Sequence, residues 1–183
     1  MAEWGERKEI GDRHEQQVTQ ELQRRGWEVH PAGQGTYPSA IRHALSRTSS
    51  PLRYFPDLIA ARGEDVVTID AKTSMRSTSS GRFAISCKCV TAGLQYMGTH
   101  APVPLLYVFG DLTILTPAEV AYYTCHGRRA HTGTYYLVNT SRAHHFDDIF
   151  GPVTTAHPNR RTTPPAHSEG RLEAVPWLRH EAA

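Results

Sequence analysis

The sequence predicts an α/β domain with a mixed β-sheet of four or five strands flanked by helices, followed by an extended C-terminal tail. Three kinds of pattern predict this class. They are a run of helix formers over residues 6–25, a hairpin pattern over 56–72, and short apolar runs at 103–109 and 112–115. We therefore expect one folded domain over residues 1–150 and a proline-rich tail over residues 151–183, partly disordered or docked.

The composition limits the function classes. Hydrophobic residues make up 39% of the 183 residues, which is enough for one packed core. A formal net charge of +2 excludes both a uniformly basic nucleic-acid coat and an acidic tail protein. No apolar run reaches membrane-span length, the first residues are charged, and three cysteines fit reduced thiols. We expect a cytoplasmic protein with no membrane partner.

The first predicted helix, residues 6–25, carries an acid on its apolar face. Glu15 precedes Val18 by three residues and Leu22 by seven, so the three side chains share one face. A short strand at 27–30 follows, and then a loop rich in Gly, Ser, Pro and Arg over residues 31–56. A loop of this length inside a compact domain is usually functional.

The hairpin pattern brings two further acids together. A turn at residues 62–65 places Ala61 opposite Val66, and the same register places Asp57 opposite Asp70. The side-chain period of two puts Lys72 on the same face as Asp70. The sequence therefore predicts two carboxylates and one ammonium group at the same end of the hairpin.

The remaining elements follow from shorter patterns. Residues 73–82 read as a polar loop. We expect strands at 83–86, 103–109, 112–115 and 134–139, and helices at 88–97 and 117–123.

Opposed carboxylates indicate a cation site. The two carboxylates repel each other unless one is protonated or a cation binds between them. A site made only of oxygen ligands suits Mg²⁺. Such an ion polarises a phosphodiester and lowers the pKa of a bound water. Lys72 can hold the attacking water, neutralise charge developing on phosphorus, or act as a base if its pKa is depressed near the metal. Glu15 can complete the metal shell or orient its waters.

These residues carry a resemblance to a known superfamily. Pro56-Asp57, twelve intervening residues and Asp70-Ala71-Lys72, after a helix bearing Glu15, resemble the PD-(D/E)xK nucleases. The Gly11-x-x-x-Glu15 helix, short strand and basic loop look most like the Holliday-junction-resolvase-like branch. The resemblance covers residues 6–75.

The resemblance implies a restriction-endonuclease-like fold and a metal-dependent DNA nuclease that uses Mg²⁺, with Mn²⁺ as a substitute. By this analogy Asp57, Asp70, Glu15 and the backbone carbonyl of Ala71 bind the metal, and Lys72 is catalytic with the three acids. It also implies cleavage that leaves a 5′-phosphate, and a homodimer if the resolvase-like assignment holds.

Local charge suggests where DNA binds. Residues 31–56 and 71–110 together contain seven Lys and Arg and no acid. Basic side chains that lead into Asp57 would line an approach to the metal. The candidate DNA-binding residues are Arg42, Arg47, Arg53, Arg76 and Arg82.

Other interpretations stay open at this point. The same fold could serve as a nucleic-acid-binding module without cleavage, or as an exonuclease. Asp57 could also be a plain turn residue, with Asp70 and Lys72 on an exposed strand edge. A zinc site is a further alternative, although its spacing is poor. Its candidate ligands are Cys87, Cys89, Cys125 and His126.

Overall fold

A mixed five-stranded sheet forms the centre of the protein. The computed structural model describes residues 4–73, 77, 80–125 and 134–153. The sheet order is β1-β2-β3-β5-β6, in which β3 and β5 are parallel and the other neighbours antiparallel. The strands are β1 (Glu28–Pro31), β2 (Leu58–Arg62), β3 (Asp65–Lys72), β5 (Leu105–Phe109) and β6 (Ile114–Leu115). The predicted α/β class with a mixed sheet is confirmed, whereas the tail from residue 154 onward lies outside the described residues.

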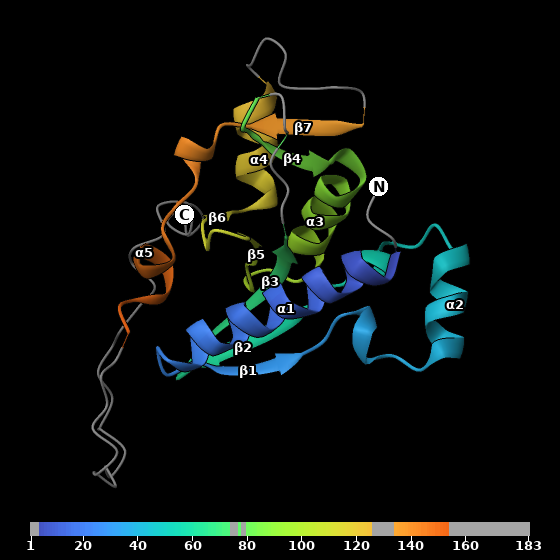
Figure 1. The fold of residues 1–183 in the computed structure, drawn as a ribbon, viewed down its shortest axis with the longest axis horizontal. Helices are drawn as coiled ribbons and strands as arrows, with labels where there is room; N and C mark the ends of the chain where they lie inside the picture. Colours follow the sequence, from blue (N-terminus) through green and yellow to red (C-terminus); the bar gives the residue numbers. More distant parts are fainter. Residues whose placement is uncertain (1–3, 74–76, 78–79, 126–133, 154–183) are drawn as a thin grey trace, which may run out of the picture.

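Helix α1 (Trp4–Gln23) lies across one face of this sheet (Figure 1). Its Val18 and Leu22 are fully buried against apolar side chains of β2, β3 and β5. The short helix α5 (Phe146–Phe150) adds Phe146 and Phe150 to the same core. The apolar face predicted for the first helix is thus the face that the helix buries. Across the described segments, no helix is both long enough and apolar enough to cross a membrane.

The opposite face of the sheet packs against a second layer. It consists of β4 (Phe83–Ser86), α3 (Cys87–Thr99), α4 (Pro117–Cys125) and β7 (Tyr135–Val138). Strands β4 and β7 pair with each other, antiparallel, in a separate two-stranded sheet. Phe83 stacks on Phe109 with ring centroids 3.9 Å apart, which joins the small sheet to the central one.

Residues 32–56, which we call the arm, are more ordered than the predicted loop. They contain α2 (Ser39–Arg47) between two short 3₁₀ turns, η1 (Gln34–Thr36) and η2 (Pro51–Tyr54). No residue of α2 is buried, and the helix stands apart from the sheet (Figure 1). Phe55 contacts Tyr96 edge to face, with centroids 5.7 Å apart, and so fixes the end of the arm on α3. The prediction of a continuous loop was therefore wrong.

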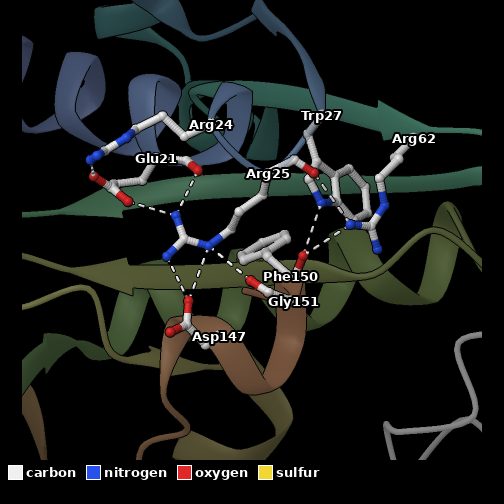
Figure 2. A network of polar contacts seen from close by, with 8 residues as sticks. All are labelled: Glu21, Arg24, Arg25, Trp27, Arg62, Asp147, Phe150 and Gly151. Atoms are coloured by element: carbon white, nitrogen blue, oxygen red, sulfur yellow. Dashed lines mark hydrogen bonds and ion pairs between the residues drawn. The ribbon is translucent and has the colours of Figure 1, made fainter. Parts of the chain in front are cut away.

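A buried arginine joins the end of α1 to α5 (Figure 2). Arg25 is 6% exposed, and its guanidinium contacts Glu21 Oε2 at 2.5 Å and Asp147 Oδ1 at 2.6 Å. Its Nε also donates to the carbonyl of Gly151 at 2.9 Å. Arg62, at the end of β2, donates to the carbonyl of Phe150 at 3.1 Å. Charge-assisted hydrogen bonds of this kind hold the C-terminal part of the domain against the central sheet.

Candidate active site

The β2–β3 hairpin has the predicted register. Leu58 pairs with Ile69 and Ala61 with Val66, across a turn in which Gly63 has φ of +62°. Asp57 immediately precedes β2, so the pair next outward is Asp57 and Asp70. Glycine suits the turn because it adopts positive φ without steric cost. The register therefore brings the two acids to neighbouring positions at the carboxyl end of β3.

Asp57 is fixed from two sides. Its Oδ2 accepts a hydrogen bond from the backbone N–H of Ala71 at 2.9 Å. Its carbonyl oxygen accepts from the N–H groups of Ala32 at 2.7 Å and Gly33 at 3.0 Å. Burial raises the pKa of Asp57 to about 8, and the nearby carboxylates of Asp70 and Glu15 act in the same direction. A charged Asp57 is therefore unfavourable here unless a cation offsets it.

Lys72 forms an ion pair with Asp70. Its Nζ lies 2.5 Å from Asp70 Oδ2, and the two side chains are only 12% and 16% exposed. Burial by itself would lower the pKa of Lys72, but the Asp70 carboxylate and weaker contributions from Cys89 and Asp57 together outweigh it, so the net pKa is raised. The ammonium group is therefore retained at neutral pH. The expected depression of the Lys72 pKa concerns a site that holds a metal ion, so it stays a prediction.

An aromatic ring lies beside the Lys72 ammonium. Tyr107 is fully buried on β5, pairs with Asp70 in the parallel register, and has its ring centroid 5.1 Å from Lys72 Nζ. Its hydroxyl donates to the carbonyl of Cys89 at 2.9 Å. A Cβ at Gly93 would lie 2.5 Å from the tyrosine oxygen, so glycine makes room for it. Sequence analysis missed Tyr107, and a glycine inside the predicted helix 88–97 was the available signal of close packing.

Glu15 lies within electrostatic reach of the hairpin acids. Burial raises its pKa first, and the charges of Asp12 and Asp70 add to the shift. The adjacent His14 is buried, with its Nε2 3.0 Å from the carbonyl oxygen of Val108 on β5. That contact fixes the rotation of α1 over the sheet beside Glu15.

The donor chemistry of these residues fits a hard divalent cation. Asp57, Asp70 and Glu15 offer carboxylate oxygens. The pKa of Asp57 is raised by burial first and by the two other carboxylates second, and a bound cation would offset both effects. Within the described part of the chain, no three acidic, histidine or cysteine side chains are already gathered at coordination distance. Cys87 and Cys89 lie at the start of α3, whereas His126 of the zinc alternative is outside the described residues.

The candidate DNA-binding arginines fall into different settings. Arg42 and Arg47 are exposed on α2. Arg53 donates to the carbonyl of Thr48 at 3.1 Å and so also braces the arm internally. Arg82 is half-buried just before β4, and Arg76 lies outside the described residues.

The mixed sheet, with α1 across one face, has the restriction-endonuclease-like fold. Two acids and a lysine lie at one end of its central hairpin. Among solved structures, the chain is similar to Hjc, a Holliday junction resolvase from the hyperthermophilic archaeon Archaeoglobus fulgidus. The TM-score is 0.52 at 12% sequence identity, and the match covers 77% of this chain and 100% of that chain. Neither a protein-family model nor a curated protein sequence matches the chain.

Proposed function

We propose that this chain is a metal-dependent nuclease that hydrolyses phosphodiester bonds in DNA. The observation that carries the proposal is the juxtaposition of Asp57, Asp70 and Lys72 at one end of the central hairpin, with the pKa of Asp57 raised to about 8. Two half-buried acids that repel each other cost stability unless a cation or a proton offsets their charge, and groups with strongly shifted pKa values cluster at functional sites. The fold is consistent with this chemistry but does not by itself define it.

The residues divide into two roles in this proposal. Asp57 and Asp70, with Glu15 and the carbonyl of Ala71, hold Mg²⁺, and Mn²⁺ can replace it. When bound, the ion supplies Lewis-acid polarisation of the phosphodiester and acidifies a water. The Lys72 ammonium, whose pKa is raised, stabilises the negative charge that develops on the phosphoryl oxygens. The product carries a 5′-phosphate.

The arm supplies the DNA contacts in the proposal. Arg42 and Arg47 are exposed on α2, where solvent-facing guanidinium groups can reach phosphates. Arg53 and Arg82 are further proposed DNA contacts, and Arg76, which lies outside the described residues, stays a candidate. The likeness to a Holliday junction resolvase makes a four-way junction the first substrate to test, and a homodimer the first assembly.

The test is cleavage of a panel of four-way junction, duplex, nicked and single-stranded DNA by the purified protein. We expect cleavage with Mg²⁺ or Mn²⁺ and none with EDTA. The variants Asp70→Ala and Lys72→Met should each lose at least about 100-fold in rate while binding DNA normally. A wild-type protein that leaves every substrate intact with both metals would refute the nuclease proposal.

One observation favours a second candidate, a DNA-binding module without cleavage. The Lys72 ammonium already neutralises much of the Asp70 charge at 2.5 Å, so this carboxylate attracts a metal less strongly than an unpaired one would. If Asp70→Ala leaves DNA affinity unchanged and the wild type never cleaves, the binding module is the correct assignment. Cleavage of closed circular DNA separates an endonuclease from an exonuclease, because a circle has no end.

A further inference from the structure

Gly33 lies against Asp57 with no room for a side chain. Gly33 is buried, and a Cβ built on it would lie 2.8 Å from Asp57 Cα and 2.8 Å from Asp57 Oδ1. We propose that Gly33 is a positioning residue of the active site, which sets where the Asp57 carboxylate stands. The inference rests on the proposed function, because it assigns Asp57 to the metal.

The contact has a second component in the backbone. The N–H groups of Ala32 and Gly33 both donate to the carbonyl of Asp57, at 2.7 and 3.0 Å. These residues begin the arm, and Pro56, which precedes Asp57, ends it. Both ends of the arm therefore lie next to Asp57: its first residues through hydrogen bonds, and its last residue through the peptide bond. A shift of the first residues consequently displaces Asp57.

Neighbouring side chains hold Gly33 in place. The hydroxyl of Thr36 donates to the carbonyl of Gly33 at 2.8 Å, and the Thr36 N–H donates to the same oxygen at 3.0 Å. Gln34, the next residue, donates through its side-chain amide to the carbonyl of Arg53. Hydrogen bonds within η1 thus hold the start of the arm in its turn, and the Gln34 bond connects it to η2.

The requirement for glycine at position 33 is steric. Gly33 has φ of −69° and ψ of 180°, a conformation open to any residue. An alanine would therefore suit the backbone and would fail only because of the space that Asp57 occupies. Since one of the two close atoms is the Cα of Asp57, rotation of a side chain cannot relieve the clash. Either Asp57 or the Ala32–Gly33 backbone must move, and misplacement of a catalytic group by about 1 Å costs about 100-fold in rate.

Gly35 offers a matched control two residues away. A Cβ at Gly35 meets nothing within 4 Å, and its φ does not fall in the region that requires glycine. The experiment compares Gly33→Ala, Gly35→Ala and the wild type in the full chain. It measures affinity for Mn²⁺ alone by calorimetry, the cleavage rate at saturating DNA, and hydrogen exchange at the amides of residues 32 and 33.

We expect Gly33→Ala to bind Mn²⁺ at least about tenfold more weakly and to cleave about 100-fold more slowly. Its amides at 32 and 33 should exchange faster, because their bonds to Asp57 are stretched. Gly35→Ala should match the wild type in all three measurements. Wild-type Mn²⁺ affinity together with wild-type exchange in Gly33→Ala would overturn the inference.

The exchange measurement separates this inference from the proposed function. If the wild type neither binds metal nor cleaves, the nuclease proposal fails. The positioning of Asp57 then still stands if Gly33→Ala, unlike Gly35→Ala, loses amide protection, and it falls if protection is unchanged.

A milder variant covers the case in which Gly33→Ala does not fold. Thr36→Val removes the hydroxyl bond to the Gly33 carbonyl. We expect a loss of Mn²⁺ affinity of about threefold or more, which is less than the roughly tenfold for a direct partner of a metal ligand, because Thr36 acts on Asp57 through Gly33. Thr36→Ser keeps the hydroxyl and should restore the affinity. A Thr36→Val protein with wild-type Mn²⁺ affinity and wild-type amide exchange would contradict the proposal that Thr36 holds Gly33 against Asp57.

Discussion

The Lys72 ammonium lies over the ring of Tyr107, 5.1 Å from its centroid, while the same ammonium contacts Asp70 at 2.5 Å. The ring face attracts the cation, and the attraction strengthens when solvent is excluded, as it is here. Tyr107 is in turn fixed by its hydroxyl bond to the Cys89 carbonyl on α3. The position of the proposed catalytic lysine therefore depends on a strand and a helix that the hairpin motif does not include.

Replacement of Tyr107 by Phe keeps the ring and removes the hydroxyl, so it distinguishes the contributions of the two groups. The ring remains beside Lys72, so the cleavage rate should fall far less than in Lys72→Met. The Cys89 carbonyl loses its donor, which should lower the free energy of unfolding by about 1–2 kcal/mol. Urea unfolding and cleavage assays on the two variants measure these effects. A rate loss in Tyr107→Phe as large as that of Lys72→Met would show that the hydroxyl, and not the ring, acts on the lysine.

The raised pKa of Asp57 predicts how stability depends on pH in the absence of metal. Its pKa is about 8 in the folded protein and near its ordinary value of 3.8 when unfolded, so the folded state holds a proton that the unfolded state releases. The free energy of unfolding should therefore fall as pH rises from about 4 to about 8, by at most about 1.4 kcal/mol per pH unit.

The measurement is urea unfolding in EDTA across this pH range, for the wild type and Asp57→Asn. The amide cannot ionise, so the variant should lose less stability between pH 5 and pH 8 than the wild type. Titrating groups that do not interact with Asp57 cancel in the difference, so the difference reports Asp57 together with the coupled carboxylates of Asp70 and Glu15. Parallel stability curves for the two proteins would show that Asp57 does not titrate in this range.

The hairpin and its acids were predictable because their geometry is local. A four-residue connection at residues 62–65 fixes the register of β2 and β3 by counting, and the strand period places Asp70 and Lys72 on one face. Helix α1 was predictable as well, since Val18 and Leu22 mark the face that it buries. No tertiary information was needed for either.

The rest depended on contacts between distant segments. Helix α2 places Ile41, Ala44 and Leu45 on one face but buries none of them, and the Gly, Ser, Pro and Arg content of residues 31–56 favoured a loop. Tyr107 reaches Lys72 because β3 and β5 pair in parallel, and no turn fixes the register of two strands that are joined by a long crossover. The approach of Gly33 to Asp57 likewise arises from the closure of the arm, which a local pattern does not encode.

Adjacent arginines at the end of α1 should differ sharply in their contribution to stability. Arg24 and Arg25 both contact Glu21, but their side chains are 63% and 6% exposed (Figure 2). We expect Arg25→Ala to lower the free energy of unfolding by about 2–3 kcal/mol, since it strips charge-assisted bonds from Glu21, Asp147 and the Gly151 carbonyl. Arg24→Ala should cost less than about 0.5 kcal/mol. Equal losses in urea unfolding would mean that the buried network does not hold α5.

The two exposed arginines of α2 should reveal the proposed DNA surface through salt dependence. An arginine that neutralises one phosphate contributes about 0.9 to the slope of log affinity against log salt concentration, because a counterion is released. Arg42→Ala and Arg47→Ala should therefore each reduce the slope by about this amount, and the double variant by about twice as much. Arg24→Ala is the control, since Arg24 is equally basic and exposed but follows α1 and is not part of the arm. Fluorescence anisotropy with labelled DNA in EDTA, over a series of salt concentrations, gives the slopes without cleavage. If both α2 variants keep the wild-type slope, these arginines do not contact phosphates, and the DNA path must be sought on another face of the domain.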